Sequence, residues 1–392
     1  MLTRGDLERR VRELLADAVR AGVFPGAVLR VETELGETLE VPSGQLCREP
    51  EAARAASETR YDLASLTKVI ATTAIAMRAL ERGALDIVAP VAAYLPGGAP
   101  AWTRDVAVHH LLSHGSGLAG WEPLHQMLVE HGVPLGGAEA RRFVIDRILA
   151  SGPLDPPGQA SRYSDLGFLL LGAVLEKALG ADLRTLFHRE VREPFGLGRL
   201  DFRPLGRVSP SELYPESAPD PLIAPTEDCP WRGRVMVGEV HDENAWALGG
   251  IAPHAGLFGT AAEVARFGSE VLSAWRGRSN ALGQTVVRRF ARRATRPLGT
   301  TWALGWDTPS PGESSAGPTI SRRAIGALGF TGTSLWIDPA RGAVVVLLTN
   351  RVHPSRANEA IRGFRPRIHE AALAWVEAVA SERGTAPGVA SA

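Results

Sequence analysis

A serine and a lysine stand three positions apart at the start of an apolar, alanine-rich segment, as Ser65 and Lys68. Residues at this spacing share one face of a helix, so the serine hydroxyl and the lysine amine can meet. A helix N-terminus also offers free N–H donors and positive potential, which suit an oxyanion. We expect desolvation to lower the pKa of Lys68, so that its amine helps to deprotonate Ser65.

Lysine is rare in this chain, which makes its position informative. Lys68 and Lys177 are the only lysines among 43 basic residues, and the others are arginine. Arginine stays protonated in proteins and cannot take a proton from a serine. The Ser65–Lys68 spacing still recurs by chance in unrelated chains, so further residues must support a catalytic interpretation.

A tyrosine forms the second candidate element. Tyr163 lies between a loop signature, Asp155–Gly158, and a predicted helix that begins at Asp165. A tyrosine at such a junction can project into a cleft, and near a lysine its phenolate can act as a general base. The alternative is that Ser164 is only the N-cap of the helix and that Tyr163 packs. The residues alone leave both interpretations open.

Glycines cluster just before a predicted strand, in the segment Gly326–Thr333. Glycine at a strand edge lets a substrate approach the backbone, and N–H groups there can complete an oxyanion hole with that of Ser65. The alternative is a bulged edge strand without a role in catalysis.

Secondary-structure signals place strands at both ends of the chain and helices in the middle. A stretch rich in Pro, Asp and Glu, 203–233, lacks periodicity and is expected to be a long irregular loop. The expected helices cover residues 5–22, 65–81, 138–150, 164–179, 183–193, 261–274 and 358–380. The expected strands cover residues 28–33, a second strand after a turn at 34–37, and then 300–306, 322–325, 333–337 and 343–349.

This order predicts an α+β fold in which both ends of the chain build one antiparallel sheet flanked by terminal helices. Residues 1–75 and 275–392 are expected to form this discontinuous sheet domain. Residues 76–274 are expected to form an inserted, mainly helical subdomain.

Composition argues against several classes of protein. The formal net charge is +0, with 43 basic and 43 acidic residues, so nothing indicates a nucleic-acid partner or an anionic membrane. No apolar stretch is long enough to span a bilayer and no secretory signal is visible, so we expect a cytoplasmic protein, although trimming of a signal would leave the same sequence. Cys47 and Cys229 are expected to be reduced thiols, and no metal or cofactor is expected.

Taken together and in this order, the three motifs resemble those of the penicillin-recognising serine hydrolases. The chain is most similar to the class C β-lactamase-related family, which includes esterases, D-amino-acid peptidases and penicillin-binding-protein 4B-like proteins. The resemblance extends over roughly residues 20–380 and includes the stretches Tyr61–Lys68, Leu111–Leu118, His254–Phe258 and Gly329–Pro339. It implies the β-lactamase/DD-peptidase fold, with the helical subdomain inserted in the sheet domain.

The resemblance also implies roles for individual residues. Ser65 resembles the acylated nucleophile, and Lys68 resembles its partner in deprotonation. Tyr163 resembles the base that relays the proton to the leaving group and later activates water. Asp165 stands where many relatives have an asparagine, which contacts the substrate and the lysine.

The strand edge that would face the substrate departs from the family pattern. By resemblance, Gly329 and Phe330 border the substrate, and the N–H groups of Phe330 and Ser65 form the oxyanion hole. Relatives carry Lys-Thr-Gly, His-Thr-Gly or His-Leu-Gly where this chain has Ala327-Leu328-Gly329. Loss of the cation or imidazole argues against efficient β-lactam or D-Ala-D-Ala turnover, but it leaves the groups that esters require.

Other polar residues near these motifs have simpler interpretations. His114 and His254 lie in glycine-containing loops, where a structural hydrogen-bonding role is expected. The segment Asp242–Asn244 is expected to begin a helix. Arg322 and Arg323 precede the altered motif, and one of them can point into the cleft and supply the missing positive charge.

The sequence therefore predicts a serine hydrolase that forms an acyl-enzyme on Ser65 and hydrolyses a small ester or amide, as carboxylesterases do. Two alternatives stay open: a D-stereospecific peptidase or β-lactamase, and a binding homologue whose catalysis Ala327 has weakened. The acyl group, the leaving group and the oligomeric state do not follow from the sequence.

Overall fold

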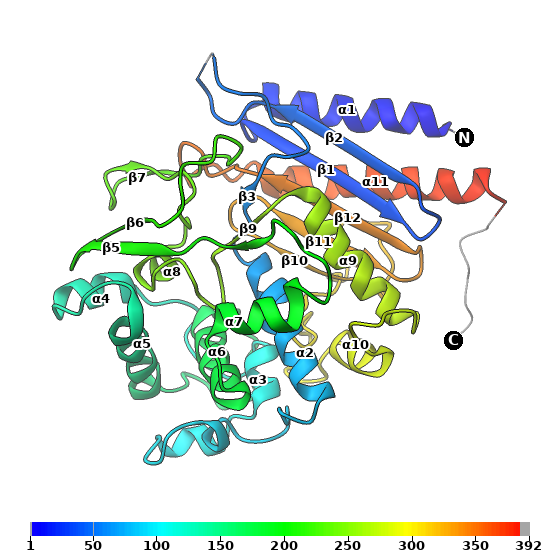
Figure 1. The fold of residues 1–392 in the computed structure, drawn as a ribbon. Helices are drawn as coiled ribbons and strands as arrows, with labels where there is room; N and C mark the ends of the chain where they lie inside the picture. Colours follow the sequence, from blue (N-terminus) through cyan, green and yellow to red (C-terminus); the bar gives the residue numbers. More distant parts are fainter. Residues whose placement is uncertain (1, 50, 385–392) are drawn as a thin grey trace.

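The computed structural model describes residues 2–49 and 51–384, and Figure 1 shows how they are arranged. The α-helices are α1 (Arg4–Arg20), α2 (Ala74–Glu81), α3 (Val108–Leu112), α4 (Leu124–Glu130), α5 (Gly137–Ser151), α6 (Asp165–Leu179), α7 (Leu183–Phe187), α8 (Glu243–Ala247), α9 (Ala261–Trp275), α10 (Gln284–Phe290) and α11 (Ile361–Glu382). The strands are β1 (Gly26–Thr33), β2 (Thr38–Gly44), β3 (Tyr61–Asp62), β4 (Asp201–Phe202), β5 (Leu205–Ser209), β6 (Glu212–Pro215), β7 (Asp228–Cys229), β8 (Arg234–Val235), β9 (Leu257–Gly259), β10 (Ile325–Leu328), β11 (Ser334–Asp338) and β12 (Ala343–Thr349).

The main sheet is antiparallel, and it joins the two ends of the chain. Its strand order is β10-β11-β12-β1-β2, so that the first strand of the sequence pairs with the last. Val31 of β1 stands opposite Val345 of β12 in this pairing. Strands from both ends of the chain therefore complete one sheet, as the sequence predicts, and β10 is left at an edge of the sheet.

Side chains of the central strands alternate between two cores. Along β12, Val345 and Leu347 point to the core shared with α1 and α11, whereas Val344 and Val346 point to the opposite core. This alternation follows from the two-residue period of a strand. Figure 1 shows α1 and α11 side by side on one face of the sheet, with α9 against the other.

The close packing of α9 on the sheet depends on a glycine. A Cβ atom built at Gly268 would lie 2.6 Å from Cγ1 of Val344 and 3.2 Å from Cδ1 of Leu335. The helix can approach the strands only because this position lacks a side chain. The expected division of domains assigns residues 261–274 to the helical part, whereas α9 packs against β1, β11 and β12 of the sheet.

The remaining helices form a second body under the sheet, around the apolar helix α6. The apolar core is continuous from α6 through α2 to the sheet, and buried residues such as Phe168, Ile75 and Val346 belong to it. Because one core joins both parts, the helical part can hold side chains in a fixed position relative to the edge strand β10.

Two predicted segments differ from the structure. The stretch 203–233, expected to be irregular, contains the β5–β6 hairpin and the short strand β7. The stretch 300–306, expected to be a strand, forms only an isolated bridge between Trp302 and Asp307. Alternation over so few residues does not distinguish a strand from a turn.

Within the residues that the structure describes, no helix is both long and apolar enough to cross a bilayer. Cys47 and Cys229 are both free thiols, in agreement with the sequence prediction.

The packing of α9 can be tested at Gly268. We expect Gly268→Val to lower the free energy of unfolding by about 1–3 kcal/mol, because the added atoms overlap with Val344. Denaturant unfolding measures the change. Gly363→Ala in α11 is the control, since a Cβ atom added there would meet no other atom within 4 Å, and it should leave stability equal or raise it by about 0.5–1 kcal/mol. An unchanged midpoint for Gly268→Val would contradict the close approach.

Candidate active site

Ser65 follows a sharp turn at the end of β3. Ala64 adopts a left-handed backbone conformation with φ of 47°, which costs an alanine about 1 kcal/mol. The Asp62 carboxylate accepts a hydrogen bond of 2.8 Å from the N–H of Ala64, and this bond holds the turn. The chain then winds into a helix, because the N–H of Lys68 donates to the carbonyl of Ser65 at 3.0 Å. Strained turns of this kind are kept where the surrounding structure fixes them, often at functional sites.

The helix that carries Lys68 does not begin as an ordinary α-helix. Residues Lys68–Thr73 form a π-helical stretch, and α2 continues from Ala74. The Thr72 hydroxyl donates to the carbonyl of Pro253 at 2.6 Å, which ties the wide turn to the segment before β9. π-Helical turns are rare and occur frequently at functional sites.

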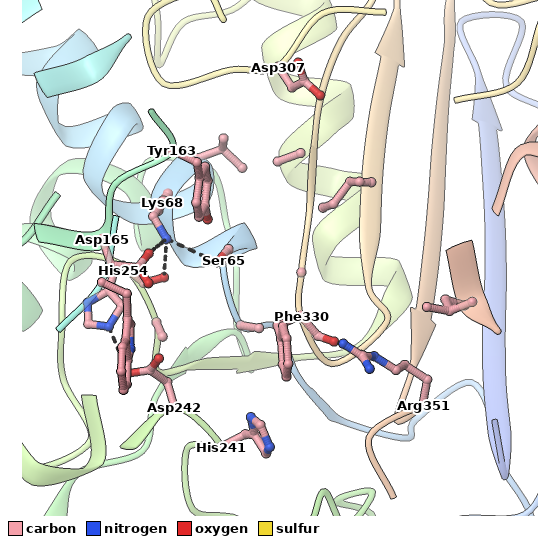
Figure 2. A pocket seen from close by; sticks show the side chains of 18 of the residues that line it. Ser65, Lys68, Tyr163, Asp165, His241, Asp242, His254, Asp307, Phe330 and Arg351 are labelled. Carbon is pink, nitrogen blue, oxygen red and sulfur yellow. Dashed lines mark hydrogen bonds and ion pairs between the residues drawn. The ribbon is translucent and has the colours of Figure 1, made fainter. Parts of the chain in front are cut away.

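Lys68 is buried at the centre of a small polar cluster, shown in Figure 2. Its ammonium nitrogen donates to Ser65 Oγ at 3.1 Å and to the carbonyl of His254 at 3.3 Å. It also forms an ion pair of 2.6 Å with Asp165 Oδ1. The Ser65–Lys68 contact predicted from the spacing is therefore present.

The pKa of Lys68 shifts in the direction opposite to the sequence prediction. Burial lowers the pKa of Lys68, but the neighbouring Asp165 carboxylate, together with Tyr163, raises it by more, so the net pKa lies above the ordinary value. The sequence prediction counted desolvation and missed the strength of a carboxylate at 2.6 Å. Lys68 is thus an ammonium in the resting protein.

Tyr163 lies against the same cluster. The Lys68 ammonium is 4.8 Å from the centre of the tyrosine ring. Burial raises the pKa of Tyr163, whereas the charge of Lys68 lowers it, and the net shift is upward. The phenol is therefore protonated at neutral pH, beside a cation that would stabilise its phenolate. In Figure 2 the tyrosine hydroxyl points toward the side chains of Ser65 and Lys68.

His114 holds the loop that presents Tyr163. Its ring packs 4.6 Å from the ring of Tyr163, and its Nδ1 accepts a hydrogen bond of 3.1 Å from the N–H of Ser164. Burial lowers the pKa of His114 well below its ordinary value, so the imidazole is neutral and can accept this bond. Ser164 is indeed the N-cap of α6, since its hydroxyl accepts from the N–H of Gly167 at 2.9 Å. The N-cap interpretation of Ser164 is therefore confirmed, and the catalytic role of Tyr163 stays a prediction.

The turn after β10 is fastened directly to the segment before Ser65. The Thr331 hydroxyl donates to the carbonyl of Asp62 at 2.8 Å, and the Thr333 hydroxyl donates to the carbonyl of Leu63 at 3.1 Å. A Cβ atom at Gly329 would lie only 1.9 Å from Thr333 Oγ1 and 2.7 Å from the carbonyl oxygen of Leu63. Gly329 is thus required by the close approach of two chain segments, beyond any part in substrate binding.

Phe330 projects from this turn into the cavity and is half exposed. The Arg351 guanidinium lies 4.4 Å from the centre of its ring, and the imidazole of His241 stacks on it at 5.6 Å. Arg351 also donates to the carbonyl of Phe330 at 2.7 Å. These contacts fix the peptide whose N–H group is the second candidate oxyanion donor.

The cavity above Ser65 has a volume of about 600 Å³, which suits a small organic substrate. The carboxylates in its lining are Asp165, Asp242, Glu243, Asp307 and Glu359. The arginines in its lining are Arg351, Arg356, Arg362 and Arg365. Apolar surface is contributed by Val69, Trp121, Trp302, Ala327, Leu328, Phe330 and Ile361.

Sequence reasoning placed the positive charge at the wrong position. Arg322 lines a separate cavity, and neither Arg322 nor Arg323 is among the residues that line the cavity above Ser65. Arg351 is the guanidinium beside Phe330 instead. It comes two residues after the end of β12, and no pattern within the chain distinguishes it from the many other arginines.

The sequence predicts only structural roles for Asp242 and His254, but the structure places both at the serine site. Asp242 is the N-cap of α8, as expected, but it also lines the cavity and accepts a hydrogen bond of 2.9 Å from His254 Nε2. Burial raises the pKa of Asp242, yet His254 and Lys68 lower it by more, so Asp242 is ionised. The pair lies directly beside the Lys68 ammonium.

Two groups of described side chains have the composition of a metal site, namely Glu227, Cys229 and Glu243, and a group beside Ser65. Potential ligand atoms of Asp165, Asp242 and His254 lie within 4.8 Å of one another. The Lys68 ammonium already lies 2.6 Å from Asp165, and a metal ion here would have to compete with this charge. The Lys68 ammonium therefore already supplies a positive charge beside these carboxylates, as a metal ion would.

Comparison with known proteins identifies relatives along most of the chain. A family model described as Beta-lactamase matches residues 7–365. An N-acetylmuramyl-L-alanine amidase of Bacillus subtilis (strain 168) is 32% identical over 370 residues, covering 88% of this chain and 81% of that protein. A putative D-alanyl-D-alanine carboxypeptidase of Salmonella paratyphi A is 28% identical over 332 residues, covering 78% of this chain and 72% of that protein.

Solved structures share the fold. EstCE1, a hydrolase with promiscuous acyltransferase activity, superposes with a TM-score of 0.69 at 23% identity, covering 94% of this chain and 99% of that chain. A penicillin-binding protein homologue from Caulobacter crescentus gives a TM-score of 0.68 at 21% identity, with coverage of 94% and 98%. The resemblance and the fold class predicted from the sequence are confirmed, and the chain belongs to the Beta-lactamase family and is a serine hydrolase with the fold of that family.

Proposed function

We propose that the protein hydrolyses a small ester through an acyl-enzyme on Ser65. The observation that carries this proposal is the 3.1 Å contact between Lys68 Nζ and Ser65 Oγ at the base of a cavity of about 600 Å³. The N–H groups of Ser65 and Phe330 belong to two segments that are hydrogen-bonded to each other, which favours their use as a joint oxyanion hole.

The proposed reaction begins from an enzyme that has lost one proton from the Lys68–Tyr163 pair. Tyr163 phenolate, stabilised by the Lys68 ammonium, takes the proton of the Ser65 hydroxyl as Ser65 Oγ bonds to the substrate carbonyl carbon. The resulting oxyanion accepts hydrogen bonds from the N–H groups of Ser65 and Phe330. When the ester bond breaks, Tyr163 returns this proton to the leaving alcohol. A water molecule then repeats these steps and releases the acid.

In this scheme the negative charge of Asp165 balances the positive charge of Lys68. Its carboxylate fixes Lys68 as an ammonium at 2.6 Å, so Lys68 orients the Ser65 hydroxyl and stabilises the phenolate rather than acting as the free base. The pKa of Lys68 and the pKa of Tyr163 both lie above their ordinary values, so the active form becomes populated only as pH rises.

Esters are favoured over amides by the wall of the cavity. Ala327 and Leu328 occupy the positions where relatives have a basic or imidazole group and a hydroxyl, and both line the cavity. An alcohol leaving group requires less help from a proton donor than an amine does. Without that imidazole or lysine, Tyr163 alone must protonate the leaving group.

Amide hydrolysis is the second candidate function. The relative with 32% identity is called an N-acetylmuramyl-L-alanine amidase, and another is called a putative D-alanyl-D-alanine carboxypeptidase. These names support an amide or D-amino-acid substrate in the same cavity. The proposed substrate is in either case a small molecule, and nucleic acid is not among the proposed partners.

The acyl-enzyme can be tested by labelling. We expect a fluorophosphonate probe to form one adduct, which peptide mass spectrometry places on Ser65, and we expect Ser65→Ala to lose both the adduct and ester turnover, by about 1,000-fold or more. Ser151→Ala, on the outer part of α5, is the control and should behave as the wild type. Full turnover in Ser65→Ala would exclude the proposed nucleophile.

The pH dependence tests the role of Asp165. We expect the wild-type acid limb of kcat/KM to lie above neutral pH, because the pKa values of Lys68 and Tyr163 are both raised. Asp165→Asn removes a charge that raises both values, so the acid limb should move to lower pH by about 1–3 units. Asp307→Asn makes the same change elsewhere in the cavity and should leave the limb in place. An unshifted limb in Asp165→Asn contradicts the proposed balance of charge.

A substitution at Ala327 tests whether the protein hydrolyses esters or amides. We expect the wild type to hydrolyse p-nitrophenyl esters while nitrocefin and D-Ala-D-Ala peptides stay near background. Ala327→His should raise amide turnover relative to ester turnover by about tenfold, since it restores an imidazole beside the leaving group. Ala327→Gln, similar in size but unable to titrate, should not. Enzyme-like nitrocefin hydrolysis by the wild type would favour the β-lactamase alternative.

A further inference from the structure

A second cleft lies away from Ser65, and its volume of about 780 Å³ exceeds that of the cavity above the serine. One wall is formed by the end of α10 and the segment that follows it, and the opposite wall by the start of α3. The loop residues 157–159 close one side. None of the proposed catalytic side chains lines this cleft.

Arginines dominate the first wall. Five arginines occur within residues 288–296, and Arg289, Arg292, Arg293 and Arg296 line the cleft. No aspartate or glutamate is among the residues described as lining it. Like charges so close together repel one another. An anion bound between these arginines would reduce the repulsion and stabilise the wall.

Three of these arginines have no counter-charge within the described parts of the chain. Arg293 donates to Thr308 Oγ1 and to the carbonyl of Pro309, both at 2.6 Å. Among the described residues, Arg289, Arg292 and Arg296 take part in no ion pair and in no side-chain hydrogen bond. Elsewhere on the surface, arginines such as Arg276 are paired with carboxylates.

Two histidines, His109 and His110, also line the cleft. His110 Nδ1 accepts a hydrogen bond of 3.1 Å from the N–H of Ala107, which leaves the proton of a neutral ring on Nε2. Burial and the neighbouring His109 lower the pKa of His110 to about 4, so the ring is neutral at pH 7. His109 Nδ1 donates to the carbonyl of Ile87 at 3.0 Å. The cleft thus combines guanidinium charge with the neutral imidazole of His110.

We propose that this cleft binds a small ligand that carries two or more phosphoryl groups. Guanidinium groups bind phosphoryl oxygens in a bidentate manner, and three unpaired guanidinium groups match more than one doubly charged phosphoryl group. The volume of the cleft is sufficient for such a small molecule. A free oligophosphate and a phosphorylated metabolite present the same chemistry to it.

One loop contributes to both the cleft and the serine site, but none of the proposed catalytic side chains lines the cleft. Gly158 donates its N–H to the carbonyl of Gly115 at 2.8 Å, and the same loop leads to Tyr163, which packs on His114. Binding in the cleft does not require turnover at Ser65. The proposal therefore succeeds or fails independently of the proposed ester hydrolysis.

Calorimetric titration of the full chain with sodium tripolyphosphate tests the proposal. We expect saturable binding with one site per chain, weakened by added salt, and about tenfold or more weaker in the double variant Arg292→Ala/Arg296→Ala. The matched control is Arg9→Ala/Arg142→Ala, which removes the same charge from two exposed arginines outside the cleft. The control should bind as the wild type does. A thermal melt of each variant verifies that it is folded.

Three outcomes would overturn the proposal. One is the absence of saturable binding of tripolyphosphate by the folded wild type. Another is an equal loss of affinity in the control double variant, which would show a response to net charge alone. The third is saturable binding of a DNA duplex that tripolyphosphate cannot displace, which would make the cleft part of a polymer-binding surface.

Discussion

The site depends on one junction between two distant parts of the chain. The hydroxyls of Thr331 and Thr333 donate to the carbonyls of Asp62 and Leu63, across a sequence separation of about 270 residues. Gly329 permits this approach because any side chain there would overlap with both segments. The junction places the backbone of Ser65 beside the backbone of Phe330. Every other contact of the cluster, from the Lys68 ammonium to the loop of Tyr163, is arranged around a serine whose position this junction sets.

Electrostatics then determine what the cluster can do. A single carboxylate, Asp165, converts a buried lysine from a candidate base into a fixed cation. The Asp242–His254 pair lies beside Asp165 and the same ammonium. In the proposed reaction, with the lysine charged, the phenol of Tyr163 is the group that transfers a proton, and its phenolate has a cation 4.8 Å from its ring. The balance of charge thus separates the orienting role from the proton-transfer role.

Much of this arrangement could be predicted from the sequence, because it follows from local patterns. The spacing of Ser65 and Lys68, the helix that begins at Asp165 and the strand pairing of the two chain ends all recur in the structure. Features that depend on contacts between particular side chains could not be predicted. The upward shift of the Lys68 pKa needs a carboxylate from another helix, the packing of α9 on the sheet needs Gly268 beside Val344, and the guanidinium beside Phe330 comes from a segment without any motif. The assignment of catalytic roles, and the boundaries of the two domains, stay predictions.

The pairing of β1 with β12 has a consequence for how the chain folds during its synthesis. Val31 finds its partner, Val345, only after more than three hundred further residues have left the ribosome. Until then β1 can pair with β2 alone, its other edge has no partner, and the face that it shares with α1 and α11 is covered by α1 only. Contacts so distant in sequence also slow folding, because a long loop must close before they form. The nascent chain therefore carries β1 without β12 while more than three hundred residues are added, and the serine site can assemble only after Phe330 and its turn have been synthesised.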